Sequence, residues 1–204
     1  MDENACLIST SYFPSIYYFW LIGKHSTVWI EACENFQKQT FRNRTYILTA
    51  NGIERLTVPV RRANSKQSIA EVEIDNSVRW YAQHWRALQS AYGKAPFFLY
   101  FRDWIHDILF KKHTFLLELN QDILTTCLHQ IWKTSITIQF TTNYQKTAIP
   151  SLQDYRQAIE SVQFFKQIEY PQCFGNKFVP HLSVLDLLFC IGNLPFDKFG
   201  GKIE

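Results

Sequence analysis

The start of the chain holds two apolar segments with a helix-like segment between them, and this arrangement constrains the fold more than any other feature. Residues Ala5 to Thr10 are mainly apolar and partly β-branched, as a buried strand requires. Pro14 suits the first turn of a helix over Ser15 to Gly23, and Thr27 to Ala32 is a second strand-like segment. Strands buried on both faces are typical of parallel pairs joined by a helix. We therefore predict a βαβ unit that opens an α/β fold.

A β-hairpin is predicted after this unit. Residues Thr45 to Thr49 and Arg55 to Val60 have strand composition. Ala50-Asn51-Gly52 lies between them and predicts a tight turn, because Asn-Gly tolerates positive φ values. Ile69 to Ile74 alternates apolar and acidic residues, which indicates a half-exposed strand. Together these segments predict a mixed sheet with a hairpin insertion.

Most of the remaining chain has helical spacing. Asp75-Asn76-Ser77 offers N-caps for a helix over Val78 to Tyr92. The other expected elements are helices at Phe97 to Phe110, Phe115 to Ile131, Gln153 to Phe165 and Ser183 to Ile191, and a strand at Ile136 to Phe140. No internal repeat or linker divides the chain. We expect one domain over residues 1–204, in which a helical subregion at about 78–132 covers the sheet.

Composition and charge exclude several classes of protein. The hydrophobic content of 47% is ample for a core, and the net charge of +3 is weaker than the basic stripe of a dedicated nucleic-acid binder. The five cysteines contain no CxxC pair, so we expect neither a disulfide framework nor a metal site. The N-terminus is acidic, and the apolar segment Cys6 to Ile22 is too short and interrupted for a span of ~20 residues. We expect a cytoplasmic protein without a membrane span; its cofactors and oligomeric state stay open.

The segment Glu31 to Arg44, EACENFQKQTFRNR, carries the densest charge in the chain. It follows a predicted buried strand, and open α/β sheets bind ligands at the carboxyl ends of their strands. Guanidinium groups suit phosphate or carboxylate ligands. The polar members are Glu31, Glu34, Lys38, Arg42, Asn43 and Arg44. An equally good interpretation is a solvated loop whose exposed ion pairs contribute at most about 1 kcal/mol each.

His84 is the candidate general acid or base, because an ordinary histidine has a pKa near ~6.5. It shares a face of the predicted helix with Trp80. The competing interpretation, a packed histidine with both nitrogens bonded, is the stronger one for an aromatic helix. Cys33 is a weaker candidate nucleophile near several cations. The sequence has no Gly-rich phosphate loop, GxSxG or HExxH motif.

Four blocks of the sequence carry a resemblance that covers nearly the whole chain. They are YFPSIYYFWLI, ENFQKQTFRNRTYILTANGIERLTVPV, EVEIDNSVRWYAQHWRALQSAYGKAPFF and HLSVLDLLFCIG. In order and spacing they resemble the WbqC-like family, bacterial proteins often associated with surface-polysaccharide gene sets. Typical members have His-Gln-Pro before the Tyr-x-Pro and two acidic residues after the second strand. Here those places hold Ile8, Ser9 and Thr10, and Ala32 and Cys33.

The residues and the resemblance together give a leading hypothesis and two rivals. The leading one is an enzyme-like binder of an anionic small molecule, a nucleotide-sugar or acyl donor, of transferase type in surface-polysaccharide biosynthesis. Its expected catalytic residues are Glu34 and His84, and its expected ligand-binding residues are Tyr12, Lys38, Arg42, Asn43, Arg44, Trp80, Tyr92 and Asp186. This hypothesis requires the cations and His84 to face one hollow. The rivals are a non-catalytic protein-binding or scaffold member and, ranked last, an RNA-binding protein.

Overall fold

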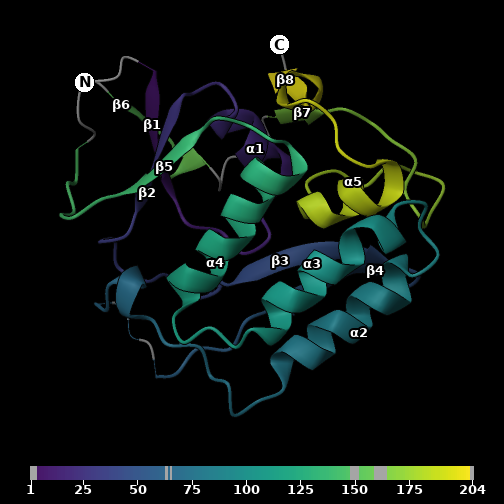
Figure 1. Cartoon of the computed structure of the whole chain (residues 1–204), viewed down its shortest axis with the longest axis horizontal. Helices are drawn as coiled ribbons and strands as arrows, with labels where there is room; N and C mark the ends of the chain where they lie inside the picture. The colour runs from purple at the N-terminus through teal and green to yellow at the C-terminus, as the bar shows by residue number, and fades with distance from the viewer. Residues whose placement is uncertain (1–3, 63, 65, 148–151, 159–164, 203–204) are drawn as a thin grey trace.

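The structure is a computed structural model that describes residues 4–62, 64, 66–147, 152–158 and 165–202. Its parts form layers that are visible in Figure 1. A small sheet lies at one side, helix α4 runs beside it, and helices α2 and α3 cover the hairpin β3–β4 at the other side. One cluster of buried residues includes side chains from both parts.

The predicted βαβ unit is confirmed. Strand β1 (Ala5–Ser9) is followed by helix α1 (Ile16–Ile22) and strand β2 (Thr27–Glu31). The two strands pair in parallel, with Ala5 opposite Thr27 and Ser9 opposite Glu31. Every residue of β1 is buried, as expected for a parallel strand covered on both faces. The carboxyl ends of β1 and β2 therefore lie next to each other.

Two later strands complete a four-stranded sheet. Strand β5 (Thr137–Phe140) pairs with β2, and strand β6 (Leu152–Asp154) pairs with β1. The order is β5-β2-β1-β6, and all neighbours are parallel. All four strands consequently end at the same edge, although they come from distant parts of the sequence.

The predicted hairpin is also confirmed, as strands β3 (Arg44–Thr49) and β4 (Gly52–Thr57). Gly52 has φ of 102°, a backbone conformation that glycine adopts without strain. A second antiparallel pair, β7 (Phe165–Gln167) with β8 (Gly200–Lys202), was not predicted. Parallel and antiparallel pairing both occur, but in separate sheets.

The α/β class is shown by the helices that accompany these sheets. Helices α2 (Trp80–Tyr92), α3 (Phe98–Phe110), α4 (Leu116–Thr125) and α5 (Val184–Ile191) confirm predicted helices. Helix α4 continues as a π-helical segment, η2 (Thr126–Ile131), and a short 3-10 helix, η4 (Phe196–Lys198), lies near the C-terminus. Ser183 caps α5, as predicted, by accepting a hydrogen bond from the Leu185 amide. Within the described residues, no helix combines the length and the apolar composition needed to cross a bilayer.

The strand predicted over Ile69 to Ile74 is wrong. The segment begins with a 3-10 helix, η1 (Ile69–Glu71), and only Glu73 and Ile74 make isolated bridges. Its buried residues are Ile69, Val72 and Ile74. The spacing of three between the first two suits a 3-10 turn, which the apparent alternation of apolar and acidic residues concealed.

The helix predicted over Gln153 to Phe165 is wrong in its described part. Leu152–Asp154 is β6, a turn follows it, and Phe165 opens β7; residues 159–164 lie outside the described residues. A strand of three residues is too short for its periodicity to be recognised. Its formation depends on pairing with β1, which is distant in sequence.

A buried carboxylate joins several of these elements. Asp186 on α5 has 0% exposure and accepts hydrogen bonds from Tyr92 (2.7 Å), Tyr170 (2.9 Å) and Gln172 (3.0 Å). The Tyr92 hydroxyl also accepts a hydrogen bond from the Leu48 amide at 3.0 Å. Burial raises the pKa of Asp186, while the three donors act in the opposite direction. The cluster connects α2, α5, the hairpin and the segment around residue 171.

We expect Asp186→Ala to lower the free energy of unfolding by more than about 3 kcal/mol. Three buried donors would lose their acceptor, and an unsatisfied buried group costs about 1–3 kcal/mol. Urea denaturation of the purified variant measures the loss. Asp103→Ala is the control, because the Asp103 side chain is 83% exposed and surface changes stay within about 0.5 kcal/mol. Equal losses in the two variants would contradict the bridging role of Asp186.

Candidate functional site

The carboxyl edge of the four-stranded sheet contains a cleft of about 340 Å³. Its walls come from the segment after β2, the residues before β3, the segment after β5, and β6 with the turn that follows it. The lining residues are Glu34, Gln37, Arg42, Tyr144, Lys146, Asp154, Arg156 and Gln157. This is the location that the sequence predicted for a ligand site in an open α/β sheet.

One wall is a buried ion pair between Arg42 and Glu34. The Arg42 Nε donates to Glu34 Oε1 at 2.8 Å, and Nη2 donates to Oε2 at 2.6 Å. Ser9, the last residue of β1, donates to Glu34 Oε2 at 3.0 Å and accepts from Arg42 Nη2 at 3.0 Å. Both side chains of the pair are more than nine-tenths buried. This two-bond geometry fixes the plane of the guanidinium group.

A second part of the lining is built around Arg156, whose side chain is 8% exposed. Its guanidinium Nη2 donates to Asp154 Oδ2 at 2.6 Å, and its Nη1 donates to Glu31 Oε2 at 3.2 Å. The guanidinium carbon lies 5.4 Å from the centre of the Tyr144 ring. Arg156 therefore joins the ends of β2 and β6 across the end of β1 that lies between them.

Glu31 is held at the end of β2 by three donors. Its side chain is 1% exposed and accepts hydrogen bonds from Arg156, from the Thr141 hydroxyl and from the Cys33 amide. Thr141, directly after β5, also accepts a hydrogen bond from the Ala32 amide at 3.0 Å. The ends of β2 and β5 are thus joined through one carboxylate.

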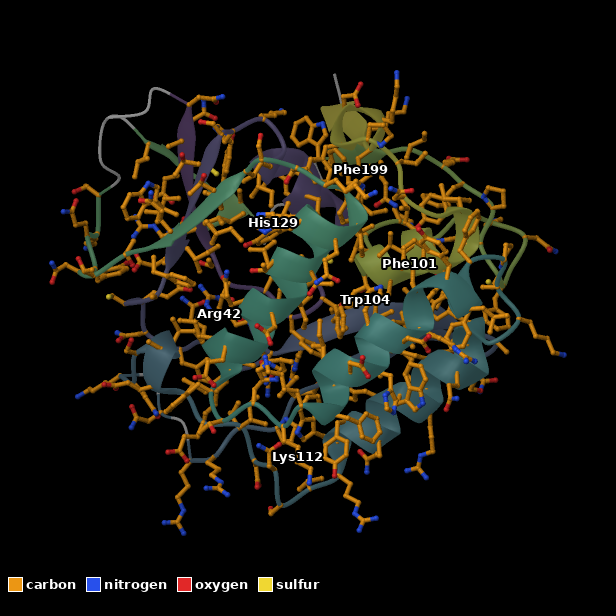
Figure 2. The ribbon with its side chains drawn as sticks, in the orientation of Figure 1. Arg42, Phe101, Trp104, Lys112, His129 and Phe199 are labelled. Carbon is orange, nitrogen blue, oxygen red and sulfur yellow. The ribbon has the colours of Figure 1, made fainter. Side chains whose placement is uncertain are left out.

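Helix α4 fixes the backbone at Arg42. Asn120 on α4 is buried and donates to the Arg42 carbonyl at 2.9 Å. Figure 2 shows Arg42 beside α4, whereas Lys112 lies toward the lower edge of the view. The neighbouring Asn43 donates to the Val58 carbonyl at 3.0 Å. Arg42 is therefore positioned by a helix, a strand end and its own carboxylate partner.

Charge pairing shifts the pKa values on the Arg156 side of the cleft. Burial alone would raise the pKa of Asp154, but the hydrogen bonds and positive charge of Arg156 hold it below its usual value. Hydrogen bonding to Asp154 in turn raises the pKa of Arg156. Both groups are therefore charged at neutral pH.

Only two of the predicted site residues line this cleft, namely Glu34 and Arg42. Lys38 is exposed and does not line it. Arg44 donates to the Gln39 carbonyl at 3.3 Å and is not among the lining residues. Asn43 is buried against the hairpin. Of the three cations predicted to bind an anion together, the cleft therefore contains Arg42 alone.

His84 lies in the aromatic core, and the structure does not bring it to the cleft. Its Nδ1 is 2.9 Å from the Tyr12 hydroxyl, and the Trp80 ring packs edge-on against it. Burial lowers the pKa of His84 to about 4, and a hydrogen bond to the Thr57 backbone partly opposes this shift. The predicted convergence of His84 with the cations is therefore not observed.

Tyr92 and Asp186, also predicted to bind ligand, belong to the buried cluster described above. The sequence reasoning missed the cleft residues contributed by the second half of the chain. These are Tyr144, Lys146, Asp154, Arg156 and Gln157. A polar segment after each strand could have indicated these residues. The sequence instead predicts a helix from Gln153 onward, which includes most of β6 and the turn after it. Among the described residues, no group of three or more His, Cys, Asp or Glu side chains could hold a metal ion.

Comparisons with known proteins match most of the length of the chain. A family model described as the WbqC-like protein family matches residues 10–150 and 148–195. The chain is also 28% identical to a protein of Mycobacterium tuberculosis named "Uncharacterized protein Rv1507c", over 221 aligned positions covering 93% of this chain and 94% of the relative. No solved structure matched the chain.

We expect His84 to make the stability of the fold depend on pH. Because its folded pKa of about 4 lies below the ordinary 6.5, the unfolded chain binds an extra proton between these values. The contribution is present above pH 6.5 and is lost as the pH falls toward 4, by about 3 kcal/mol in total. Urea denaturation at pH 7 and at acid pH should show a smaller loss in His84→Gln. His106, whose side chain is 43% exposed, gives a matched control, His106→Gln. An unchanged loss in His84→Gln would contradict this expectation.

The pair Arg42 and Glu34 should behave as one unit in a double-mutant cycle. Removing one partner of a buried pair leaves a lone charge and costs about 3–5 kcal/mol. We expect Arg42→Met and Glu34→Leu each to show such a loss, and the double variant to lose less than the sum. Urea denaturation of the four proteins measures the coupling. Additive losses would mean that the two side chains do not stabilise each other.

Proposed function

The chain belongs to the WbqC-like protein family, and on that premise we propose that the cleft at the carboxyl edge of its sheet binds an anionic small molecule. The observation that carries this proposal is the gathering of buried charges at the ends of β1, β2 and β6. Charges removed from water cost free energy, and apolar replacements are often as stable. A site that binds a charged ligand requires such buried charged side chains, held in fixed positions around a cleft.

The cations of the cleft explain the expected charge of the ligand. Arg42 and Arg156 both line the cleft, and the exposed Lys146 adds a third positive charge to its lining. Besides its carboxylate partner, Arg42 donates to Ser9 and Thr40, and Arg156 donates to Glu31 and the Gln145 carbonyl. Among the described residues these bonds use four of the five N–H groups of each guanidinium, and the fifth can bind a phosphate or carboxylate oxygen. Tyr144 offers an aromatic face beside Arg156. This combination suits a ligand with an anionic group next to a flat or polyhydroxylated group.

The carboxylates have a positioning role in this proposal. Both oxygens of Glu34 accept hydrogen bonds from Arg42, so Glu34 orients that guanidinium group. Asp154 does the same for Arg156 and is the more exposed of the two carboxylates. Oriented guanidinium groups need no rearrangement when an anion binds or when negative charge develops on it.

We propose that the ligand is a nucleotide-sugar or an acyl donor, and that the protein is a cytoplasmic transferase in surface-polysaccharide biosynthesis. This part draws its support from the context of the WbqC-like family and from the charge of the cleft. RNA is not proposed as a ligand, because the net charge of +3 is weaker than the basic stripe of a dedicated nucleic-acid binder.

A thermal-shift screen tests the binding proposal. A ligand that binds only the folded state raises the melting temperature by mass action. We expect stabilisation by at least one member of a panel of nucleotides, nucleotide-sugars, acyl-coenzyme A compounds and inorganic phosphate. Lys146→Gln should weaken that response about tenfold in apparent affinity, which corresponds to about 1.4 kcal/mol.

Lys112→Gln is the matched control for this screen. Lys112 is exposed and does not line the cleft, so its loss should leave the response unchanged. The same weakening in both variants would indicate general charge attraction. If no anion in the panel stabilises the wild type, the proposal fails.

A second candidate function is favoured by one specific feature, an exposed apolar surface at the start of α3. Leu99 is 69% exposed and Tyr100 is 79% exposed, with Phe97 next to them. Adjacent exposed apolar side chains are characteristic of protein-binding surfaces. A non-catalytic protein-binding member would therefore use α3, and substitutions in the cleft would leave its binding intact.

A further inference from the structure

Two cysteine sulfurs lie close together beside a pocket that is separate from the cleft. The Sγ atoms of Cys173 and Cys190 are 3.5 Å apart. Cys190 is buried in the last turn of α5, while Cys173 is exposed in the segment after β7. Both border a pocket of about 590 Å³, which provides access from solvent to the two sulfurs. Neither residue takes part in the function proposed for the cleft.

We propose that Cys173 and Cys190 form a reversible disulfide by exchange with a low-molecular-weight disulfide. Disulfide sulfurs are bonded at about 2.05 Å, so the two atoms, 3.5 Å apart, must approach each other by about 1.5 Å. Cys190 is fixed within a buried helix, and therefore Cys173 and its segment make the movement. The exposed sulfur reacts first because a small disulfide can reach it through the pocket.

The exchange proceeds in two balanced steps. The Cys173 thiolate attacks one sulfur of the small disulfide, forms a mixed disulfide and releases the other half as a thiol. The Cys190 thiolate then attacks the Cys173 sulfur, forms the internal disulfide and releases the second half as a thiol. The protein loses two protons and two electrons, and the small disulfide takes them up to become two thiols.

The surroundings of the pair set its reactivity. Burial raises the pKa of both thiols, and the negative charge of Asp186 adds to this effect. Thiolates are therefore scarce at neutral pH, and the first step is slow. The second step is favoured because it is intramolecular and the two sulfurs lie only 3.5 Å apart. Such a pair responds to sustained oxidising conditions.

The disulfide would act on the buried cluster that holds the fold together. Gln172, next to Cys173 in sequence, donates to Asp186 and to the Val179 carbonyl. Linking Cys173 to α5 would fix this segment against the helix that carries Asp186. The other cysteines differ in access, because Cys6 and Cys127 are fully buried and Cys33 is half-buried beside Thr141.

The test treats the folded protein with glutathione disulfide and counts free thiols. After excess oxidant is removed, the protein is denatured and alkylated, and intact mass gives the number of alkylated cysteines. We expect this number to fall from five to three in the wild type. Peptide mapping without reduction should then show Cys173 joined to Cys190, and reduction with dithiothreitol should restore five. The oxidised protein should melt at a higher temperature than the reduced protein.

Single serine variants distinguish the two steps. Cys190→Ser should stop at the mixed disulfide, so glutathione remains attached to Cys173. Cys173→Ser should keep all four of its cysteines free, and this exposed change does not threaten folding. Cys33→Ser is the matched control and should still form the disulfide. The proposal is overturned if the wild type keeps five free thiols, if glutathione stays on Cys173 without resolution, or if another pair forms.

Discussion

The parallel pairing of β1 with a neighbour on each side is the constraint on which the rest of the structure depends. Because β1 lies between β2 and β6, the residues that end these strands meet at one edge. Ser9, Glu31 and Asp154 owe their proximity to this register. The two arginines then connect carboxylates that the sheet has already placed. The cleft is thus a product of strand order more than of any local motif.

Burial has opposite consequences for the two groups of polar residues in this protein. At the carboxyl edge, Glu34 and Asp154 each have a guanidinium partner, and both arginines line the cleft. In the core, Asp186 has only uncharged donors, and burial keeps His84 neutral. The first arrangement retains charge for an incoming ligand, whereas the second uses polar groups to join helices to the hairpin. The extent of burial alone would therefore not distinguish a polar residue of the cleft from one that joins elements of the core.

Sequence reasoning was most successful where structure is local. The βαβ unit, the hairpin around Gly52 and the main helices follow from short-range patterns of apolar residues and from turn chemistry. It failed for β6, whose three residues are a strand only because β1 offers a free edge. That single error removed Asp154 and Arg156 from consideration, although Glu34 and Arg42 of the same cleft had been singled out. Helical spacing also does not predict what a given face of a helix contacts. His84 could face either a cleft or the aromatic core, and its contacts with Tyr12 and Trp80 place it in the core.

The late position of β6 in the chain has a consequence for synthesis on the ribosome. A nascent chain that has emerged as far as α4 already contains β1 and β2, but neither of the outer strands that flank them. Until those strands arrive, the inner pair exposes unpaired backbone groups along both edges, which invites pairing with other chains. Contacts between residues so far apart in sequence also form slowly. Production of this protein should therefore be sensitive to growth temperature and to the supply of chaperones during translation.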